Sequence, residues 1–166
     1  GLAPAAVLWQ VCLQTEPCWL PETWKLGYGV FVLAAFSALR LAKFNIDETQ
    51  TVEFCGLPTP AGSLLCASLG MLWQQGAVAL SSDGVLLIAV LTSLLLVSPI
   101  RMFALKFHGF GWRGNEVRYL FLLASIVLII ILRTYAIPVI IVLYIVVSAV
   151  RWLCMRSGNP DKAPKA

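Results

Sequence analysis

The chain has 166 residues, of which 60% are hydrophobic and 12% are charged, and its formal net charge at pH 7 is +4. Soluble domains carry about 25% charged residues, so this composition and the mean hydropathy of +0.86 exclude an ordinary soluble domain. The apolar residues form long runs without the alternation of a β-barrel strand. We therefore expect transmembrane helices, because lipid offers no partner to an unpaired backbone N–H or C=O group.

The predicted elements begin with an apolar run at residues 1–13. A spanning helix needs about 20 apolar residues. This run is shorter and starts with Gly instead of Met, so we interpret it as the remainder of a truncated helix. Full spans are predicted at residues 25–43, 61–80, 85–100, 119–132 and 136–152. The predicted fold class is all-α, a polytopic transmembrane helix bundle with about five full spans plus the truncated first one.

The connectors between the predicted spans are short. They comprise polar loops at residues 16–22 and 45–54, a tight turn at 81–84, a basic connector at 101–118 and a turn at 133–135. No connector is long enough for a second domain. We therefore assign residues 1–156 to one transmembrane domain and residues 157–166 to a mobile cytoplasmic tail.

The basic residues fall mainly on one side of the predicted bundle. When the sides alternate through the spans, only Lys25 and Arg133 lie on one side, which leaves ten of the 12 Lys and Arg residues on the other. The positive-inside rule makes the second side cytoplasmic. We expect a multi-pass protein of the cytoplasmic membrane, with its C-terminus in the cytoplasm. The positive charge favours anionic lipid head groups, and no nucleic-acid partner is expected.

The five cysteines show no metal-binding spacing. Cys12 and Cys18 could pair near the outer face, but the favoured interpretation is that cysteines here are small packing residues. His108 lies among aromatic and basic residues and is interpreted as part of an interfacial segment.

Arg40 is the residue most difficult to reconcile with a simple span. Lys25 and Arg40 are fifteen residues apart, about 22 Å along a helix, whereas the hydrocarbon core is about 30 Å thick. One of these charges must therefore snorkel or face a polar cavity. Arg40 and Lys43 have i, i+3 spacing and share a helix face.

The next helix is predicted to begin on the same side, with Thr59 as its N-cap and Pro60 as its first residue. A helix N-terminus attracts anions. Together with Arg40 and Lys43, it could form an anion pocket near the cytoplasmic interface. The alternative is a snorkelling Arg/Lys pair beside an ordinary helix start, and the residues by themselves leave both interpretations open.

Two motifs resemble a known family. The sequence R-L-A-K-F-N at residues 40–45, followed by F-C-G-L-P-T-P-A-G at 54–62, closely resembles the phosphatidylserine synthase branch of the CDP-alcohol phosphatidyltransferase family. In that branch, an R-L-A-R-F-N-type helix end precedes F-x-G-L-P-T-P-A. The opening G-L-A-P-A at residues 1–5 looks like the stretch that follows the family's metal-binding aspartates. The later helices fit as well, so the resemblance covers the chain in order.

The resemblance implies an enzyme of phospholipid biosynthesis. Such enzymes transfer a phosphatidyl group from CDP-diacylglycerol to L-serine and release CMP, using a divalent metal, Mg²⁺ or Mn²⁺, held by an aspartate signature. That signature is absent from this sequence, so no catalytic or metal-binding residue is assigned within it. We expect the signature in a preceding segment, with two earlier helices and the start of a third, and we expect this chain alone to be inactive.

The resemblance carries site roles onto seven residues of this chain. Arg40 and Lys43 would bind the phosphate of the substrate or the carboxylate of serine. Asn45 and Thr59 would either cap the turn or donate hydrogen bonds to the substrate. The backbone of the pocket would be shaped by Gly56, Pro58 and Pro60. The implied partners are CDP-diacylglycerol, L-serine and membrane lipids. Dimers are common in the family, so a homodimer is compatible with the resemblance.

Two alternatives to a serine-specific enzyme stay open. A sister enzyme would perform the same chemistry on another alcohol, such as glycerol 3-phosphate or inositol. A non-catalytic transporter or scaffold belongs to a different class. A transporter should carry ionisable residues near mid-membrane, or broken helices in matched halves. The last four predicted spans have almost no such residues in their interiors, which disfavours that class.

Overall fold

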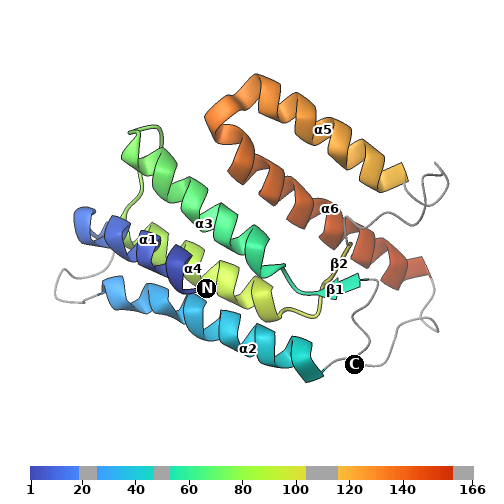
Figure 1. Ribbon diagram of the computed structural model, residues 1–166, viewed down its shortest axis with the longest axis horizontal. Coiled ribbons are helices and arrows are strands. Elements are labelled where there is room, and N and C mark those ends of the chain that lie inside the picture. Colours follow the sequence, from blue (N-terminus) through green and yellow to red (C-terminus); the bar gives the residue numbers. More distant parts are fainter. Residues whose placement is uncertain (19–25, 47–52, 104–115, 159–166) are drawn as a thin grey trace.

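The computed structural model describes residues 1–18, 26–46, 53–103 and 116–158. These residues form the α-helices α1 (Leu2–Gln14), α2 (Val32–Ile46), α3 (Thr59–Gln74), α4 (Ser82–Val97), α5 (Glu116–Leu132) and α6 (Ala136–Gly158) (Figure 1). They also form the 3-10 segments η1 (Leu26–Phe31) and η2 (Arg133–Tyr135), and the short strands β1 (Glu53–Cys55) and β2 (Arg101–Phe103). The described residues are therefore mostly helical, as predicted.

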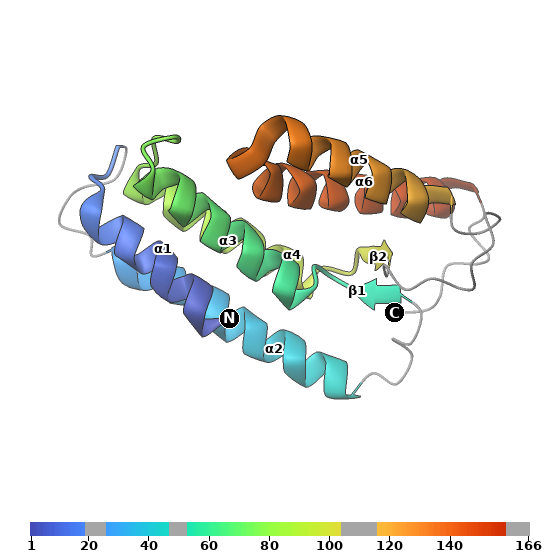
Figure 2. The same cartoon turned by 45° about the horizontal axis from the view of Figure 1, so that its top comes forward.

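The helices pack as a bundle in which α1 runs antiparallel to α4 and parallel to α3. Helix α1 contacts η1, α3 and α4, whereas α5 packs mainly against α6 at the edge of the structure (Figure 2). Small residues allow the close approaches. Gly1 lies against Ser37 on α2, Gly27 lies against Trp9, and Gly70 lies against Val7. Helix α1 thus runs antiparallel to η1 and α2, with Gly1 beside the first half of α2.

The two strands were not predicted. β1 and β2 pair antiparallel, with Phe54 opposite Met102 and Cys55 opposite Arg101. The all-α prediction is therefore incomplete, because parts of the predicted 45–54 loop and the 101–118 connector form a small sheet. Strands of three residues are too short to show a period-2 pattern in the sequence. They pair because the bundle brings the end of α4 next to the connection between α2 and α3.

Several helix boundaries differ from the predicted spans. Helix α3 ends at Gln74, ahead of the predicted end at residue 80, and Gly76 follows with a φ of +68°. The predicted turn at residues 81–84 is wrong, since these residues open α4. The Ser81 hydroxyl accepts a hydrogen bond from the Gly84 amide at 3.3 Å and so caps the helix. The sequence S-S-D-G is compatible with a helix N-cap as well as with a turn, because the same residue types favour both.

The ends of the remaining helices extend beyond their predicted bounds. Helix α2 continues to Ile46, α5 begins at Glu116, and α6 continues to Gly158. Of the predicted connectors and tail, residues 19–22, 47–52, 104–115 and 159–166 lie outside the described residues, as do Lys25 and His108.

Two described stretches are long and apolar enough to cross a membrane, Gly27–Asn45 and Val117–Cys154, with mean hydropathies of 1.3 and 2.7. The second stretch is a helical hairpin, because η2 interrupts it and Arg133 has a φ of +48°. Figure 1 shows α5 and α6 side by side and joined at this turn. The helices Leu2–Gln14 and Ser82–Val97 are apolar but shorter. The number of full spans stays a prediction.

A glycine with a left-handed backbone anchors the start of α3. Gly56 has a φ of +76°, and its amide donates to the Ile100 carbonyl at 2.9 Å. The next amide, of Leu57, donates to the Leu95 carbonyl at 2.8 Å. A Cβ atom on Gly56 would collide with the carbonyls of Leu95 and Leu96. Only glycine therefore fits between β1 and the last turn of α4.

Gly56→Ala is expected to lower the free energy of unfolding by about 2–4 kcal/mol, because it adds both a strained φ and a backbone clash. Gly76→Ala is the matched control. Its φ is also positive, at +68°, but nothing lies within 4 Å of the added Cβ, so a loss of about 1–2 kcal/mol is expected. Reversible unfolding in detergent micelles measures both. Equal losses would contradict the packing role of Gly56.

Candidate functional site

A hydrogen bond joins the two motifs of the predicted site. The Nη1 atom of Arg40, near the end of α2, donates to the Thr59 hydroxyl at the start of α3 at 2.9 Å. Both side chains are half-buried. The residues are 19 positions apart in sequence, and the connection between α2 and α3 returns the chain to the same end of the bundle (Figure 1).

The predicted capping role of Thr59 is wrong by one residue. Pro58 is the N-cap of α3, with φ −56° and ψ 131°, and no side chain caps the helix. The Pro58 carbonyl accepts hydrogen bonds from the amides of Ala61 and Gly62 at 2.9 and 3.1 Å. Thr59 is thus the first helical residue and Pro60 the second. The Thr59 hydroxyl, directed away from the helix amides, accepts from Arg40 instead.

At the start of α3, the positive potential comes mainly from Arg40 and less from free helix amides than the sequence predicted. Pro60 has no amide hydrogen, and the Ala61 and Gly62 amides are bonded to Pro58. Few amides at this end can therefore bind an anion, although the helix dipole still contributes. The guanidinium of Arg40 is the main positive group that the structure brings to Thr59.

The other predicted site residues surround this pair without joining it. Lys43 lies one turn beyond Arg40 on α2 and is exposed, and Asn45 is exposed in the last turn of α2. Asn45 was predicted to begin a loop, but it is helical. Gly56 and Pro58 lead into α3, and Pro60 is exposed in its first turn.

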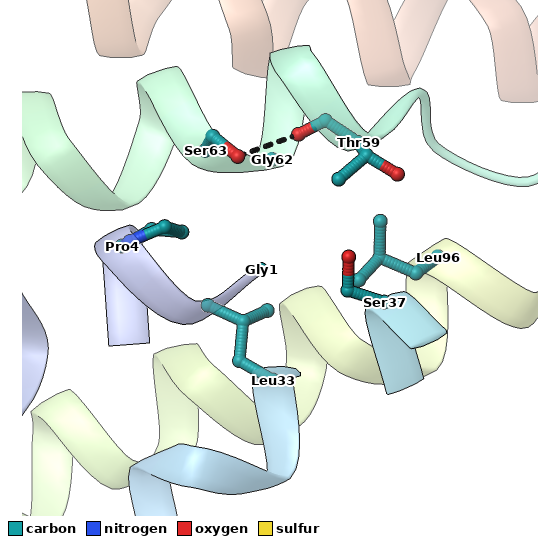
Figure 3. A pocket seen from close by; sticks show the side chains of 8 residues that line it. All are labelled: Gly1, Pro4, Leu33, Ser37, Thr59, Gly62, Ser63 and Leu96. Carbon is teal, nitrogen blue, oxygen red and sulfur yellow. Dashed lines mark hydrogen bonds between the residues drawn. The ribbon is translucent and has the colours of Figure 1, made fainter. Parts of the chain in front are cut away.

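A narrow pocket lies beside Thr59 (Figure 3). It is a crevice with no room for a water molecule, since its space of about 170 Å³ consists of narrow gaps between side chains and of open solvent. The polar lining consists of the hydroxyls of Ser37, Thr59 and Ser63 from α2 and α3, and the remaining lining residues are Gly1, Pro4, Leu33, Gly62 and Leu96. The Ser63 hydroxyl donates to the Thr59 carbonyl at 2.8 Å. Ser37 is one turn before Arg40, so this pocket is next to the Arg40–Thr59 pair.

Two residues near this end were missed by the sequence analysis. Arg118, assigned to a connector, lies in the first turn of α5 and is only 8% exposed. Tyr144, in the middle of α6, is also 8% exposed and packs edge-on against Phe121 with ring centroids 5.9 Å apart. The available signal was the presence of polar groups in otherwise apolar helices.

The described residues do not fit the metal that the resemblance implies. Within residues 1–18, 26–46, 53–103 and 116–158, no three His, Cys, Asp or Glu side chains are grouped so that they could hold an ion. The cysteines are free, Cys12 being buried and Cys18 exposed, so the less favoured possibility that these two pair near the outer face is not realised. A Mg²⁺ or Mn²⁺ site would need ligands beyond these side chains.

No family model matches this chain, and no curated protein matches it. The resemblance to the CDP-alcohol phosphatidyltransferases therefore rests on the two motifs and on the order of the helices.

Thr59→Val is expected to lower the free energy of unfolding by about 1–3 kcal/mol, because it removes the acceptor of a half-buried charged donor. In Ser63→Ala, only a bond from a side chain to a carbonyl of its own helix is lost, so a change below about 1 kcal/mol is expected. Denaturant unfolding in micelles compares the two variants. A larger loss for Ser63→Ala would contradict the importance of the Arg40–Thr59 bond.

Proposed function

We propose that this chain is the C-terminal portion of a membrane-embedded CDP-alcohol phosphatidyltransferase that transfers a phosphatidyl group from CDP-diacylglycerol to L-serine. The observation that carries the proposal is the 2.9 Å hydrogen bond between Arg40 and Thr59. Each of these residues belongs to one of the two motifs that resemble the phosphatidylserine synthase branch. Their contact makes the two motifs parts of a single site.

The distribution of side chains supports membrane embedding. On α4, the buried face carries Ser82, Val85, Ala89, Thr92, Ser93 and Leu96, whereas the exposed face carries Leu87, Leu91 and Leu94. On α5, Leu120 is 69% exposed and Ile130 is 72% exposed. Such an outward apolar surface would be unfavourable in water. In lipid it is favourable, and small and polar residues are the ones expected between packed helices.

Three serine hydroxyls in these helices have the partners that lipid requires, whereas the buried hydroxyl of Ser148 on α6 has no partner among the described residues. Ser93 donates to the Ala89 carbonyl at 2.7 Å, Ser68 donates to the Leu65 carbonyl at 2.8 Å, and Ser125 donates to the Phe121 carbonyl at 2.8 Å. Each of these three hydroxyls is thus satisfied within its own helix. This is a common way for Ser to be accommodated in an apolar environment.

The charges of the described residues gather at the two ends of the bundle. Arg40 and Lys43 lie near the end of α2, Arg101 lies on β2 just beyond α4, and Arg118 lies at the start of α5, all at one end (Figure 1). Arg133 lies at the opposite end, in η2. This separation supports a bundle that crosses the membrane with the Arg40 end in the cytoplasm.

Arg40 is suited to bind the anionic substrate. A guanidinium presents several N–H donors in a planar fork that matches phosphate and carboxylate oxygens. One donor is used by Thr59, and this neutral hydroxyl does not itself offset the positive charge. In the reaction, the serine hydroxyl oxygen forms a bond to the phosphatidyl phosphorus while the bond from that phosphorus to CMP breaks. Arg40 would stabilise a phosphate or carboxylate oxygen during this transfer.

The packing of α1 supports a complete site in a longer protein. The resemblance implies that the aspartate signature comes just before Gly1. Because Gly1 lies beside Ser37 and α1 is antiparallel to α2, a helix that continued α1 upstream would pass alongside Arg40 and Lys43. Carboxylates on such a helix would face the same end of the bundle as the Arg40–Thr59 pair.

In the full-length protein carrying the aspartate signature, Arg40→Ala is expected to reduce serine-dependent CMP release at least about 100-fold, because an anion-stabilising donor is lost. Arg133→Ala, at the opposite end of the bundle, is the control and should keep activity within about twofold. Activity would be assayed in mixed micelles of CDP-diacylglycerol with L-serine, glycerol 3-phosphate or inositol. Wild-type activity of Arg40→Ala would overturn the site, and a preference for another alcohol would overturn the serine assignment.

Cysteine labelling tests the membrane orientation. In sealed right-side-out vesicles, a membrane-impermeant maleimide should label Cys18, which is exposed at the end opposite Arg40. In a variant with Asn45→Cys as its single cysteine, labelling should occur only in inside-out vesicles, because Asn45 is exposed at the Arg40 end. Labelling of both positions from the same side would contradict the proposed topology.

A further inference from the structure

Hydrogen bonds hold the helix ends level at the end of the bundle opposite Arg40. The Thr15 hydroxyl lies 3.0 Å from the Ser82 hydroxyl, which joins the end of α1 to the start of α4. The Tyr135 hydroxyl donates to the Ala77 carbonyl at 3.3 Å, which joins η2 to the chain just after α3. The elements at this end therefore stop at a common polar level.

The helix ends on the Arg40 side are held level in the same way. The hydrogen bond from Arg40 to Thr59 joins α2 to the start of α3. The Leu57 amide donates to the Leu95 carbonyl at 2.8 Å, which joins the start of α3 to the last turn of α4. Between the two polar levels, the helices form a single apolar layer.

The thickness of this apolar layer follows from the spacing of polar residues on three helices. Each helix has one polar residue at each level, fifteen residues apart, with no charged residue between them. The pairs are Thr59 and Gln74 on α3, Asp83 and Ser98 at the ends of α4, and Arg118 and Arg133 at the ends of α5. Fifteen helical residues span about 22 Å, and less across the membrane if the helices tilt. The hydrocarbon core of a typical bilayer is about 30 Å thick.

The short helices are the ones that present apolar side chains outward. On α3, Leu64 is 54% exposed and Met71 is 50% exposed, and on α4 the corresponding values are 58% for Leu87 and 55% for Leu94. A span shorter than the hydrocarbon core cannot be matched by tilting, because tilting shortens it further. Helix α6, with 23 residues, is long enough for an ordinary core. The mismatch is therefore concentrated around α3, α4 and α5.

We propose that the bundle thins the bilayer around α3, α4 and α5, so that its preferred lipids have short acyl chains of about fourteen to sixteen carbons. The proposal rests on the membrane placement within the proposed function, and not on the reaction. In a core about 30 Å thick, each polar level would lie about 4 Å inside the hydrocarbon. Thinning brings the lipid phosphates to the level of Arg40, where a lipid substrate can reach the guanidinium.

Reconstitution of the purified full-length protein tests the preferred thickness. The vesicles would be made from phosphatidylcholines with monounsaturated chains of fourteen to twenty-two carbons. The melting temperature should be at least about 4 °C higher with the shortest chains than with the longest. A melting temperature that is independent of chain length, or highest at twenty carbons or more, would overturn the proposal. Removal of the protein from the vesicles by alkaline carbonate would overturn the membrane placement and this proposal with it.

A lengthened helix provides the matched comparison. Gln74 and Gln75 are exposed at the end of α3, so replacing both by Leu extends its apolar face by about 3 Å. This double variant should reduce the difference in melting temperature between the shortest and longest chains by at least about 1 °C. Leu91→Ala is the control, because Leu91 is 51% exposed in the middle of α4 and its replacement leaves the layer thickness unchanged. Equal effects of the two changes would contradict the thickness argument.

The rate of CMP release separates this proposal from the proposed function. With L-serine and a fixed amount of one CDP-diacylglycerol, release should be at least about threefold faster in the shortest-chain vesicles than in the longest. Equal rates in all vesicles would overturn the link between thinning and Arg40. A chain-length dependence of the melting temperature in a wild type that releases no CMP would uphold the thinning and overturn the proposed function.

Discussion

The close packing of Gly56 against the last turn of α4 sets the position from which α3 starts. The amides of Gly56 and Leu57 bond to carbonyls at the end of α4 and just beyond it, and no side chain fits on Gly56 at this contact. This anchor brings Thr59 to the end of α2, where Arg40 donates to its hydroxyl. The position of the candidate site therefore depends on the backbone contact between residues 56–57 and the end of α4, although these two segments contribute few side chains to the site.

In the proposed membrane placement, Arg40 has an energetic cost that the described residues around it only partly offset. An arginine inside a membrane-spanning helix costs roughly 2.5–3.5 kcal/mol on insertion scales. The hydroxyl of Thr59 reduces this cost, but it is not an opposite charge. The Nε atom also has no acceptor in the described part of the chain. An anionic ligand is the kind of group that completes such an environment.

The site is assembled from helices that are distant in sequence. Pro4 lies on α1, Arg40 on α2 and Thr59 on α3. The small sheet of β1 and β2 lies between α3 and the end of α6 (Figure 2). Helix α5 is held to α6 in part by the edge-on contact between Phe121 and Tyr144.

The sequence by itself determined the helical composition, the approximate positions of the helices and the concentration of basic residues toward one end. It also identified Arg40 and Thr59 individually, through the physics of a charge in an apolar helix and through motif resemblance. These properties depend on composition and on short-range periodicity. Only the tertiary structure decided that Arg40 bonds to Thr59, that Arg118 and Tyr144 are buried, and that β1 pairs with β2. These features depend on which distant segments meet, and a local pattern cannot report that because many arrangements of apolar helices bury similar faces.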